Sequence, residues 1–340
     1  MASKEARVLL VGSGGIGTIA ALNLECGGQA KVTAVLRSNY DAVSRNGFII
    51  KSCEHGDLEG WRPAQGQRNP AAVLKAVPNT SSLELGRQFE YIVCCTKNIP
   101  DAAPSLCDTI APAVSPATVI VLIQNGLNIQ LPFFQRFPSN IVLSGVSRID
   151  AHEHSPGVVE QKQHDLLYVG AFKSSHMGDE EQQQAARHFV AMYGAGGKTT
   201  CLYRPEVEFD RWEKLVYNAS FNPICALTGL NTGELQRTGR MMDTMVIPAM
   251  REVLEAARGA GHELPKDIID STIRLNPIEG DIAPSMQVDF QKGNLIEHEN
   301  ILGEVVREAQ KHSVATPVLS VLYELCCGHQ WRFKQDKGHV

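Results

Sequence analysis

The sequence has little that would suit a membrane, a secretory pathway or a nucleic acid. Within its 340 residues, no apolar run reaches the roughly 18 residues that a membrane span needs. Residues 1–6 (MASKEA) lack the apolar core of a signal peptide. The formal net charge is −5, so the chain lacks the basic field that attracts a phosphate backbone. These absences predict a cytoplasmic protein with neither a membrane nor a nucleic acid as partner.

The usual motifs of disulfide and metal sites are also missing. The nine cysteines are an odd number, and no two of them form C-x-x-C. Two adjacent pairs, Cys94–Cys95 and Cys326–Cys327, lie in apolar segments, where cysteine behaves as a small hydrophobic residue. No H-E-x-x-H motif occurs, and the histidines are scattered, with His152 and His154 in an expected loop. We therefore expect no metal in the reaction.

The chain does have the composition of an ordinary globular protein, with 43% hydrophobic and 20% charged residues. In its first half, short apolar runs alternate with helical segments, which predicts an α/β domain with a Rossmann-type, doubly wound parallel sheet. Two further apolar runs within Gly157–Gly170 predict an antiparallel hairpin at the end of this sheet. The expected parallel strands are Arg7–Val11, Lys31–Leu36, 90–96, 118–123 and Ile141–Val146.

After about residue 205, apolar residues recur at intervals of three and four, which predicts an all-α C-terminal domain. The length of the chain also favours two domains. We place a nucleotide-binding domain at 1–190 and a helical substrate-binding and catalytic domain at 191–335, with the boundary itself somewhere in 172–205. The expected helices are Val207–Phe221, Met241–Ala260, Leu295–Lys311 and Pro317–Gln330.

A glycine-rich motif follows the first expected strand and opens a helix, which is the context of a dinucleotide-binding loop. In its G-x-G-x-x-G pattern, Gly12 permits the tight turn, Gly14 lets the backbone approach a pyrophosphate, and Gly17 lets the helix pack on the strand. Free N–H groups at the start of the helix attract the phosphates. A purely structural turn is the alternative. The residues expected to contact the cofactor are Gly12, Ser13, Gly14, Gly15, Ile16 and Gly17.

The end of the second expected strand bears on the choice of nicotinamide cofactor. An NAD site usually has Asp or Glu there, to bind the ribose 2′-hydroxyl group. This strand is instead followed by Arg37, with no acidic residue beside it. Because a guanidinium group can pair with a 2′-phosphate, Arg37 favours NADP(H). A solvated surface arginine is the alternative.

The most informative segment for catalysis runs from Arg211 to Pro223 (RWEKLVYNASFNP). Lys214, Asn218 and Asn222 are spaced by four residues, so on a helix they drift by only about 80° and share one face. Their neighbours are apolar, and buried polar groups need partners, which a polar ligand would supply. Pro223 predicts a kink near the end of this helix. A solvated lysine with two capping or core asparagines is the alternative.

The pattern K-x-x-x-N-x-x-x-N-P, after an N-terminal glycine-rich nucleotide fold, resembles the ketopantoate reductase family. The resemblance extends over nearly the whole chain. It implies reduction of 2-dehydropantoate to (R)-pantoate by NADPH, in pantothenate biosynthesis. It also implies that Lys214 is the general acid and that Asn218 and Asn222 bind the substrate.

Further motifs of the family occur in order: Thr96-Lys97, Gln124-Asn125-Gly126, Ser285-Met286-x-x-Asp289 and Glu297. The resemblance implies that Lys97 lies near the cofactor and that Asn125 contacts the cofactor or the substrate. It implies that Ser285 binds the substrate and that Glu297 lies near the cofactor ribose and the catalytic lysine. For Ser285 and Glu297, a surface or capping role stays open.

Six positions depart from the family pattern. Pro284 and Ile282 replace polar residues beside the expected carboxylate site, and Asn128 replaces a glycine. The usual Thr-Glu-Ile-Asp around the acid reads Ile296-Glu297-His298-Glu299. The first two changes make the pocket less polar, so another, bulkier 2-keto or 2-hydroxy acid is the nearest alternative to 2-dehydropantoate.

The resulting hypothesis is a 2-keto acid held between the two domains, reduced by NADPH and protonated by Lys214. A non-catalytic NADP(H)-binding sensor is the second alternative, although a sensor has no need of a proton donor. Helical second domains on such folds often pair, so a homodimer is possible.

Overall fold

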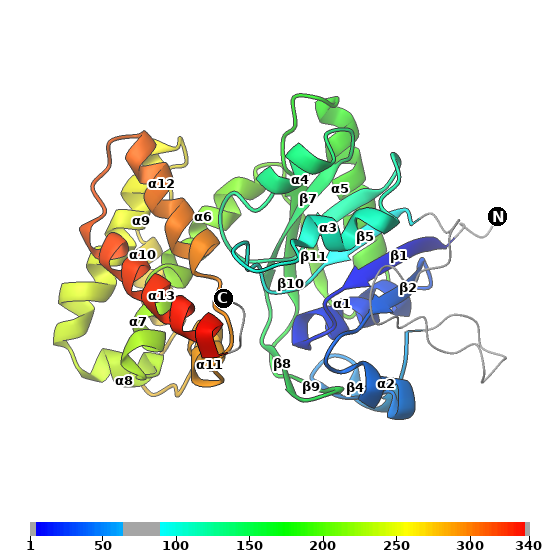
Figure 1. Ribbon diagram of the computed structural model, residues 1–340, viewed down its shortest axis with the longest axis horizontal. Helices are drawn as coiled ribbons and strands as arrows, with labels where there is room; N and C mark the ends of the chain where they lie inside the picture. The colour runs from blue at the N-terminus through cyan, green and yellow to red at the C-terminus, as the bar shows by residue number, and fades with distance from the viewer. Residues whose placement is uncertain (1–4, 64–88, 337–340) are drawn as a thin grey trace. The chain divides into compact units, whose positions relative to one another are not determined.

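The computed structural model describes residues 5–63 and 89–336 (Figure 1). Residues 1–4, part of the N-terminal segment interpreted above, lie outside the described residues. The chain divides into two compact units. The first comprises Met1–Thr96, Pro104–Gln124 and Gln130–Val207, and the second comprises Lys97–Ala103, Asn125–Ile129 and Glu208–Val340. Two short segments from the first half of the sequence thus belong to the second unit.

The first unit contains a seven-stranded sheet in the order β11-β10-β7-β6-β5-β1-β2. The five strands β1, β2, β5, β6 and β7 are parallel, while β10 is antiparallel to β7. This arrangement confirms the predicted α/β fold with a doubly wound parallel sheet. The strands are β1 (Ala6–Val11), β2 (Ala30–Val35), β5 (Tyr91–Cys94), β6 (Val119–Leu122), β7 (Val142–Arg148), β10 (Leu166–Ala171) and β11 (Thr200–Tyr203).

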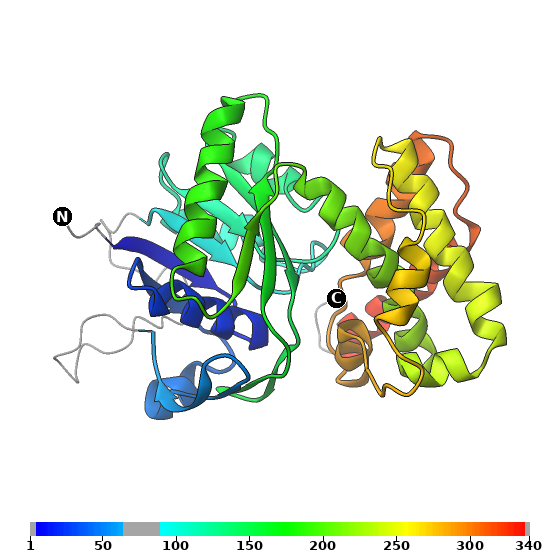
Figure 2. The ribbon, with the colours of Figure 1, turned by 180° about the vertical axis from the view of Figure 1, so that it is seen from behind.

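Helices connect these strands, as the alternating pattern predicts. Two of them, α1 (Gly15–Cys26) and α5 (Asp179–Gly194), share one buried apolar cluster with the sheet, and Figure 2 shows both on the same face. The cluster is built from strand residues such as Leu10 and from Phe189 of α5. The other short helices are α2 (Tyr40–Asn46), α3 (Leu106–Ile110), η2 (Ala111–Ala113) and α4 (Leu131–Arg136).

A second sheet in the first unit corrects one prediction. Its strands are β3 (Phe48–Ser52), β4 (Gly56–Trp61), β8 (Ala151–Ser155) and β9 (Val158–Gln161), in the order β4-β3-β9-β8. The expected hairpin of β9 and β10 is therefore wrong, because β9 pairs with β3 and β8 whereas β10 pairs with β7 and β11. The turn at Pro156–Gly157 joins β8 to β9, and the left-handed φ of 80° at Gly157 suits a tight turn.

In the described part of the second unit, the regular structure is helical, as predicted. Its core combines α6 residues such as Trp212 with residues of α9 and α13 such as Val253 and Leu322. The helices are α6 (Val207–Asn218), α7 (Phe221–Thr228), α8 (Thr232–Arg237), η3 (Met242–Val246), α9 (Ile247–Gly259), α10 (Ile268–Arg274), α11 (Ser285–Gln291), η4 (Glu299–Gly303), α12 (Glu304–Lys311) and α13 (Pro317–Asp336). Within residues 5–63 and 89–336, no helix combines the length and apolarity that a membrane crossing requires.

The main change of unit occurs at Val207, after the boundary placed at 190/191. The reason is β11, which pairs with β10 in parallel and so extends the sheet of the first unit. Sequence reasoning missed this strand because a run of only four residues is too short to show a strand pattern.

Candidate functional site

The glycine-rich loop between β1 and α1 contains two kinds of glycine. Gly12 has a positive φ of 98°, and a Cβ there would lie 2.6 Å from the backbone nitrogen of Thr96. A Cβ at Gly17 would lie 1.9 Å from the Gly12 carbonyl oxygen, so both positions require glycine for packing. A Cβ at Gly14 would meet no described atom within 4 Å. The backbone at Gly14 is therefore open to a ligand, which is what close approach of a phosphate requires.

Neighbouring residues hold this loop in place. The side chain of Asn39 donates hydrogen bonds of 2.8 Å to the Ser13 carbonyl oxygen and to Oε1 of Glu153. A Cβ at Gly15 would lie 2.1 Å from the carbonyl oxygen of Ala151, at the start of β8. Sequence reasoning missed Asn39, because a single asparagine in an expected loop carries no signal of its own.

Arg37 lies where sequence reasoning placed it, just beyond the end of β2. Leu36, directly before it, is fully buried, whereas Arg37 is exposed. The guanidinium group is thus available to a ligand bound at the carboxyl ends of β1 and β2, where open α/β sheets usually bind nucleotides.

In the second unit, the structure brings Lys214, Asn125 and Glu297 into one chain of hydrogen bonds. Nζ of Lys214 donates to Oδ1 of Asn125 at 2.8 Å, and Nδ2 of Asn125 donates to Oε2 of Glu297 at 3.4 Å. An ammonium group can only donate and a carboxylate can only accept, so together they determine the orientation of the amide between them. Glu297 is 5% exposed, and a buried carboxylate of this kind needs such partners.

Lys97 reaches the same carboxylate from a different segment. Its Nζ lies 3.8 Å from Oε2 of Glu297 and 2.6 Å from Oδ2 of Asp289, and the backbone N–H of Asn98 donates to Oε1 of Glu297. Burial lowers the pKa of Lys97, but the two carboxylates outweigh it, so that the pKa is raised. Lys97 therefore stays cationic at neutral pH. Asp289 was part of a sequence motif, but its pairing with Lys97 was not foreseen.

The segment Asn125–Ile129 is fixed from two sides. Nη1 of Arg211 donates to the Gly126 carbonyl oxygen at 2.8 Å. The backbone and the side-chain amide of Asn300 bind the backbone of Leu127 at 2.7 and 2.8 Å. Burial lowers the pKa of Arg211 to about 9, which leaves its guanidinium group charged at neutral pH. These contacts keep Asn125 within hydrogen-bonding distance of Lys214.

Replacement of Gly126 by alanine tests the importance of this fixed segment. Gly126 has a φ of 99°, and a Cβ would lie 2.5 Å from Cβ of Asn300. We expect backbone strain of about 1–2 kcal/mol and a packing cost of about 1–3 kcal/mol, seen as a lower midpoint of thermal unfolding. Gly239→Ala is the matched control, since Gly239 has a φ of 63° and open space around it. Equal shifts for both variants would contradict the tight contact with Asn300.

The two asparagines after Lys214 lie on different helices. The predicted continuous helix Val207–Phe221 is wrong, because α6 ends at Asn218 and α7 begins at Phe221. Pro223 thus falls in the first turn of α7, where a backbone N–H has no helical partner. Asn222 is 1% exposed, and its Oδ1 has no hydrogen-bond partner among the described residues. A buried amide oxygen in this state calls for a donor.

Ser285 is the first residue of α11, directly after the buried Pro284. This helix packs against α7, which carries Asn222. Ile282, in the same segment, is 38% exposed. Asn128 has a left-handed φ of 56°, which explains why glycine suits this position, and its side chain donates to Glu304.

Known proteins resemble the chain along both units. The family model "Ketopantoate reductase PanE/ApbA" matches residues 8–174, and "Ketopantoate reductase PanE/ApbA C terminal" matches residues 206–330. The protein YDL144C of Saccharomyces cerevisiae is 35% identical, over 98% of this chain and 96% of its own length.

Solved structures are similar over the same extent. The crystal structure of 2-dehydropantoate 2-reductase from Methylococcus capsulatus has a TM-score of 0.79 and 28% identity, and the match covers 96% of this chain and 97% of the other. The ternary structure of D-mandelate dehydrogenase with NADH and anilino(oxo)acetate has a TM-score of 0.80 and 19% identity, with 96% and 99% covered. The second likeness concerns the fold alone.

Proposed function

The chain belongs to the ketopantoate reductase family and is an oxidoreductase acting on CH–OH groups, and we propose that it reduces a 2-keto acid with NADPH. The observation that carries the proposal is the hydrogen-bonded series from Lys214 through Asn125 to Glu297. It supplies a positioned proton donor next to a buried carboxylate, the arrangement that general acid catalysis needs.

In the proposed reaction, the keto carbon accepts a hydride, which bound NADPH would supply, and the keto oxygen accepts a proton. Lys214 holds that proton on Nζ and gives it to the forming alkoxide. Glu297 acts through Asn125, because its carboxylate turns the amide so that Oδ1 faces the ammonium group. Lys97, paired with Asp289 and Glu297, is a proposed cofactor contact.

We further propose 2-dehydropantoate as the substrate. Besides its keto acid group, this molecule has a hydroxyl group, which can donate a hydrogen bond. The unpartnered, buried Oδ1 of Asn222 is an acceptor for such a group. Asn218 and Ser285 are the proposed carboxylate contacts.

The alternative substrate is a bulkier 2-keto acid. The apolar Ile282 and Pro284 favour it, and a similar fold occurs in D-mandelate dehydrogenase, solved with anilino(oxo)acetate.

A substrate panel separates these possibilities. NADPH oxidation would be followed by absorbance with 2-dehydropantoate, pyruvate, 2-ketoisovalerate and phenylglyoxylate. We expect rapid turnover with 2-dehydropantoate and much slower turnover with pyruvate and 2-ketoisovalerate, because both lack the hydroxyl donor. Preference for phenylglyoxylate would instead show that the substrate is an aromatic 2-keto acid. NADPH binding with no turnover would instead support a sensor.

The cofactor preference can be tested by replacing Arg37 with alanine. If its guanidinium group pairs with the 2′-phosphate, the KM for NADPH should rise by about 10- to 100-fold, as for the loss of a charged hydrogen bond. The KM for NADH should change little. Arg45→Ala is the control, since Arg45 is also exposed but bonds a carbonyl oxygen of its own helix. Equal effects on both cofactors would rule out the phosphate contact.

A further inference from the structure

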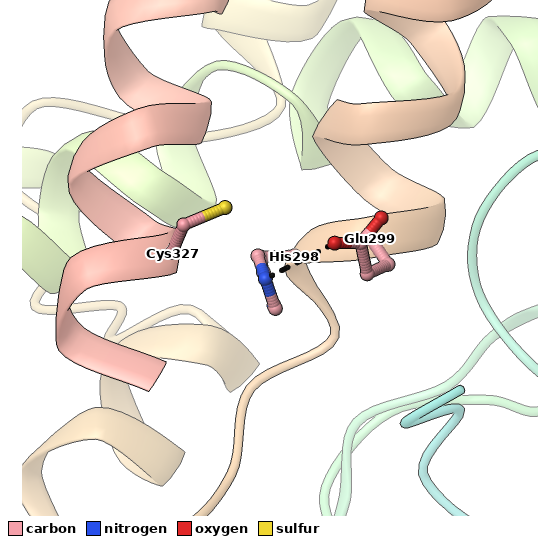
Figure 3. A group of neighbouring side chains, drawn as sticks. All are labelled: His298, Glu299 and Cys327. Atoms are coloured by element: carbon pink, nitrogen blue, oxygen red, sulfur yellow. Dashed lines mark ion pairs between the residues drawn. The ribbon is translucent and has the colours of Figure 1, made fainter. Parts of the chain in front are cut away.

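Three side chains with metal-ligand chemistry, none of them used in the proposed reaction, lie together in the second unit. His298 directly precedes η4, Glu299 is its first residue, and Cys327 lies on α13. One possible ligand atom from each residue lies within 4.8 Å of the others. Figure 3 shows the three side chains grouped between α13 and the start of η4. His298 and Glu299 also depart from the family pattern noted in the sequence.

The hydrogen bonding of His298 favours a free lone pair on Nε2. Its Nδ1 lies 3.3 Å from the Ile296 carbonyl oxygen, which can only accept, so Nδ1 carries the proton. Metal-bound histidines commonly donate their other ring N–H to a carbonyl oxygen in this way. Nε2 then faces Oε1 of Glu299 at 3.5 Å, in a place where His298 is 2% exposed. When Nε2 carries no proton, it and Oε1 are both acceptors, and a cation between them would satisfy both.

Two hydrogen bonds already hold the carboxylate of Glu299 in a position from which it could bind a cation. The hydroxyl group of Tyr323 donates to Oε1 at 2.8 Å, and Arg307 donates to Oε2 at 2.9 Å. Since each carboxylate oxygen has two lone pairs, Oε1 can still bind an ion. The ring of Tyr323 also stacks on that of His298, with 5.9 Å between the centroids. Tyr323 thus positions both neighbouring ligands.

The local charges also suit a divalent cation. Arg307 pairs with both Glu299 and Glu304, which leaves these three groups with one net negative charge. The Cys327 side chain is neutral as a thiol, and a metal ion binds it as the thiolate, after loss of its proton. A divalent cation that displaces this proton adds two positive charges and one thiolate, and the cluster becomes neutral.

We propose that Nε2 of His298, Oε1 of Glu299 and Sγ of Cys327 form a zinc site, with water as the fourth ligand. Zinc prefers such nitrogen, oxygen and thiolate ligands, and tetrahedral bonds of about 2.0–2.3 Å place ligand atoms about 3.3–3.6 Å apart. The distance of 3.5 Å between Nε2 and Oε1 fits already. Binding releases one thiol proton to solvent and joins η4 to α13.

Cobalt(II) is the probe for this site, since a cobalt–thiolate bond gives a charge-transfer absorption band. The metal-free full chain should bind one equivalent of Co²⁺ with this band, and Zn²⁺ should displace it. Cys327→Ser should abolish the band. Both Cys327→Ser and His298→Gln should weaken zinc binding, measured by competition with a chelator, by more than about 100-fold, the upper cost of losing only a supporting residue. Cys53→Ser removes an exposed cysteine of the first unit, so it should change neither the cobalt–thiolate band nor the affinity for zinc.

Unfolding provides a second readout that does not depend on reductase activity. Zinc should raise the unfolding temperature of the wild type and of Cys53→Ser, because it binds the folded state. It should not raise that of Cys327→Ser, whose circular dichroism reports whether the variant folds. A thiolate band that persists in Cys327→Ser, or no cobalt binding by the wild type, would overturn the proposal and leave a hydrogen-bonded His298–Glu299 pair.

Discussion

Lys214→Ala is expected to lower the turnover number for 2-keto acid reduction by about 10²- to 10⁴-fold, the usual contribution of a general acid. The variant loses the ammonium group that donates to Asn125, which is the proposed source of the proton for the forming alkoxide. NADPH binding should remain nearly unchanged, since the proposed cofactor loop belongs to the first unit. Steady-state kinetics and fluorescence titration with NADPH measure the two effects separately.

Two further variants make this test specific. Lys214→Arg keeps the positive charge but holds its proton far more tightly, so it should recover little turnover if proton donation is the essential role. Lys173→Ala removes an exposed lysine that pairs with Glu206, and it should behave as the wild type. Near-normal turnover of Lys214→Ala would show that Lys214 is not the general acid.

Gly14→Ala is expected to weaken NADPH binding by about 10- to 100-fold without loss of stability. The added Cβ meets no described protein atom within 4 Å, and the φ of −80° suits alanine. The substitution should therefore cause neither a packing clash nor backbone strain. The new methyl group would, however, occupy the space through which a pyrophosphate approaches the backbone. Loss of one charge-assisted hydrogen bond accounts for an effect of this size.

The control for this prediction is another glycine at a helix start. Gly178 precedes α5 just as Gly14 precedes α1, and its φ of −61° also suits alanine. Gly178→Ala should leave both the NADPH dissociation constant and the unfolding temperature nearly unchanged. Unaltered NADPH affinity in Gly14→Ala would mean that the cofactor does not approach this position.

Much of the fold could be predicted because local patterns determine it. Apolar runs such as Arg7–Val11 became parallel strands, and helical spacing after residue 205 became the all-α unit. Strand partners were harder to predict. The run that became β9 has the composition of any half-buried strand, and its pairing with β3 depends on a segment roughly a hundred residues earlier, a distance at which local composition carries no information.

The site was predictable where a motif gave residue types and spacing, as for Lys214, Asn125 and Glu297, which the structure brings together. Partners that act through tertiary contacts were not. Asn39 holds the glycine-rich loop from another strand end, and Arg211 reaches Gly126 across a long stretch of sequence. The break between α6 and α7 was also missed, since helical periodicity continues through Ala219 and Ser220.

The second unit includes two short segments, Lys97–Ala103 and Asn125–Ile129, that the first half of the sequence supplies. A single cut at Val207 would therefore divide the proposed site, with Lys97 and Asn125 on one fragment and Lys214 and Glu297 on the other. Recombination between relatives meets the same constraint. A chimera that exchanges the helices must exchange these two segments with them if it is to keep the hydrogen bonds that join Lys214, Asn125 and Glu297.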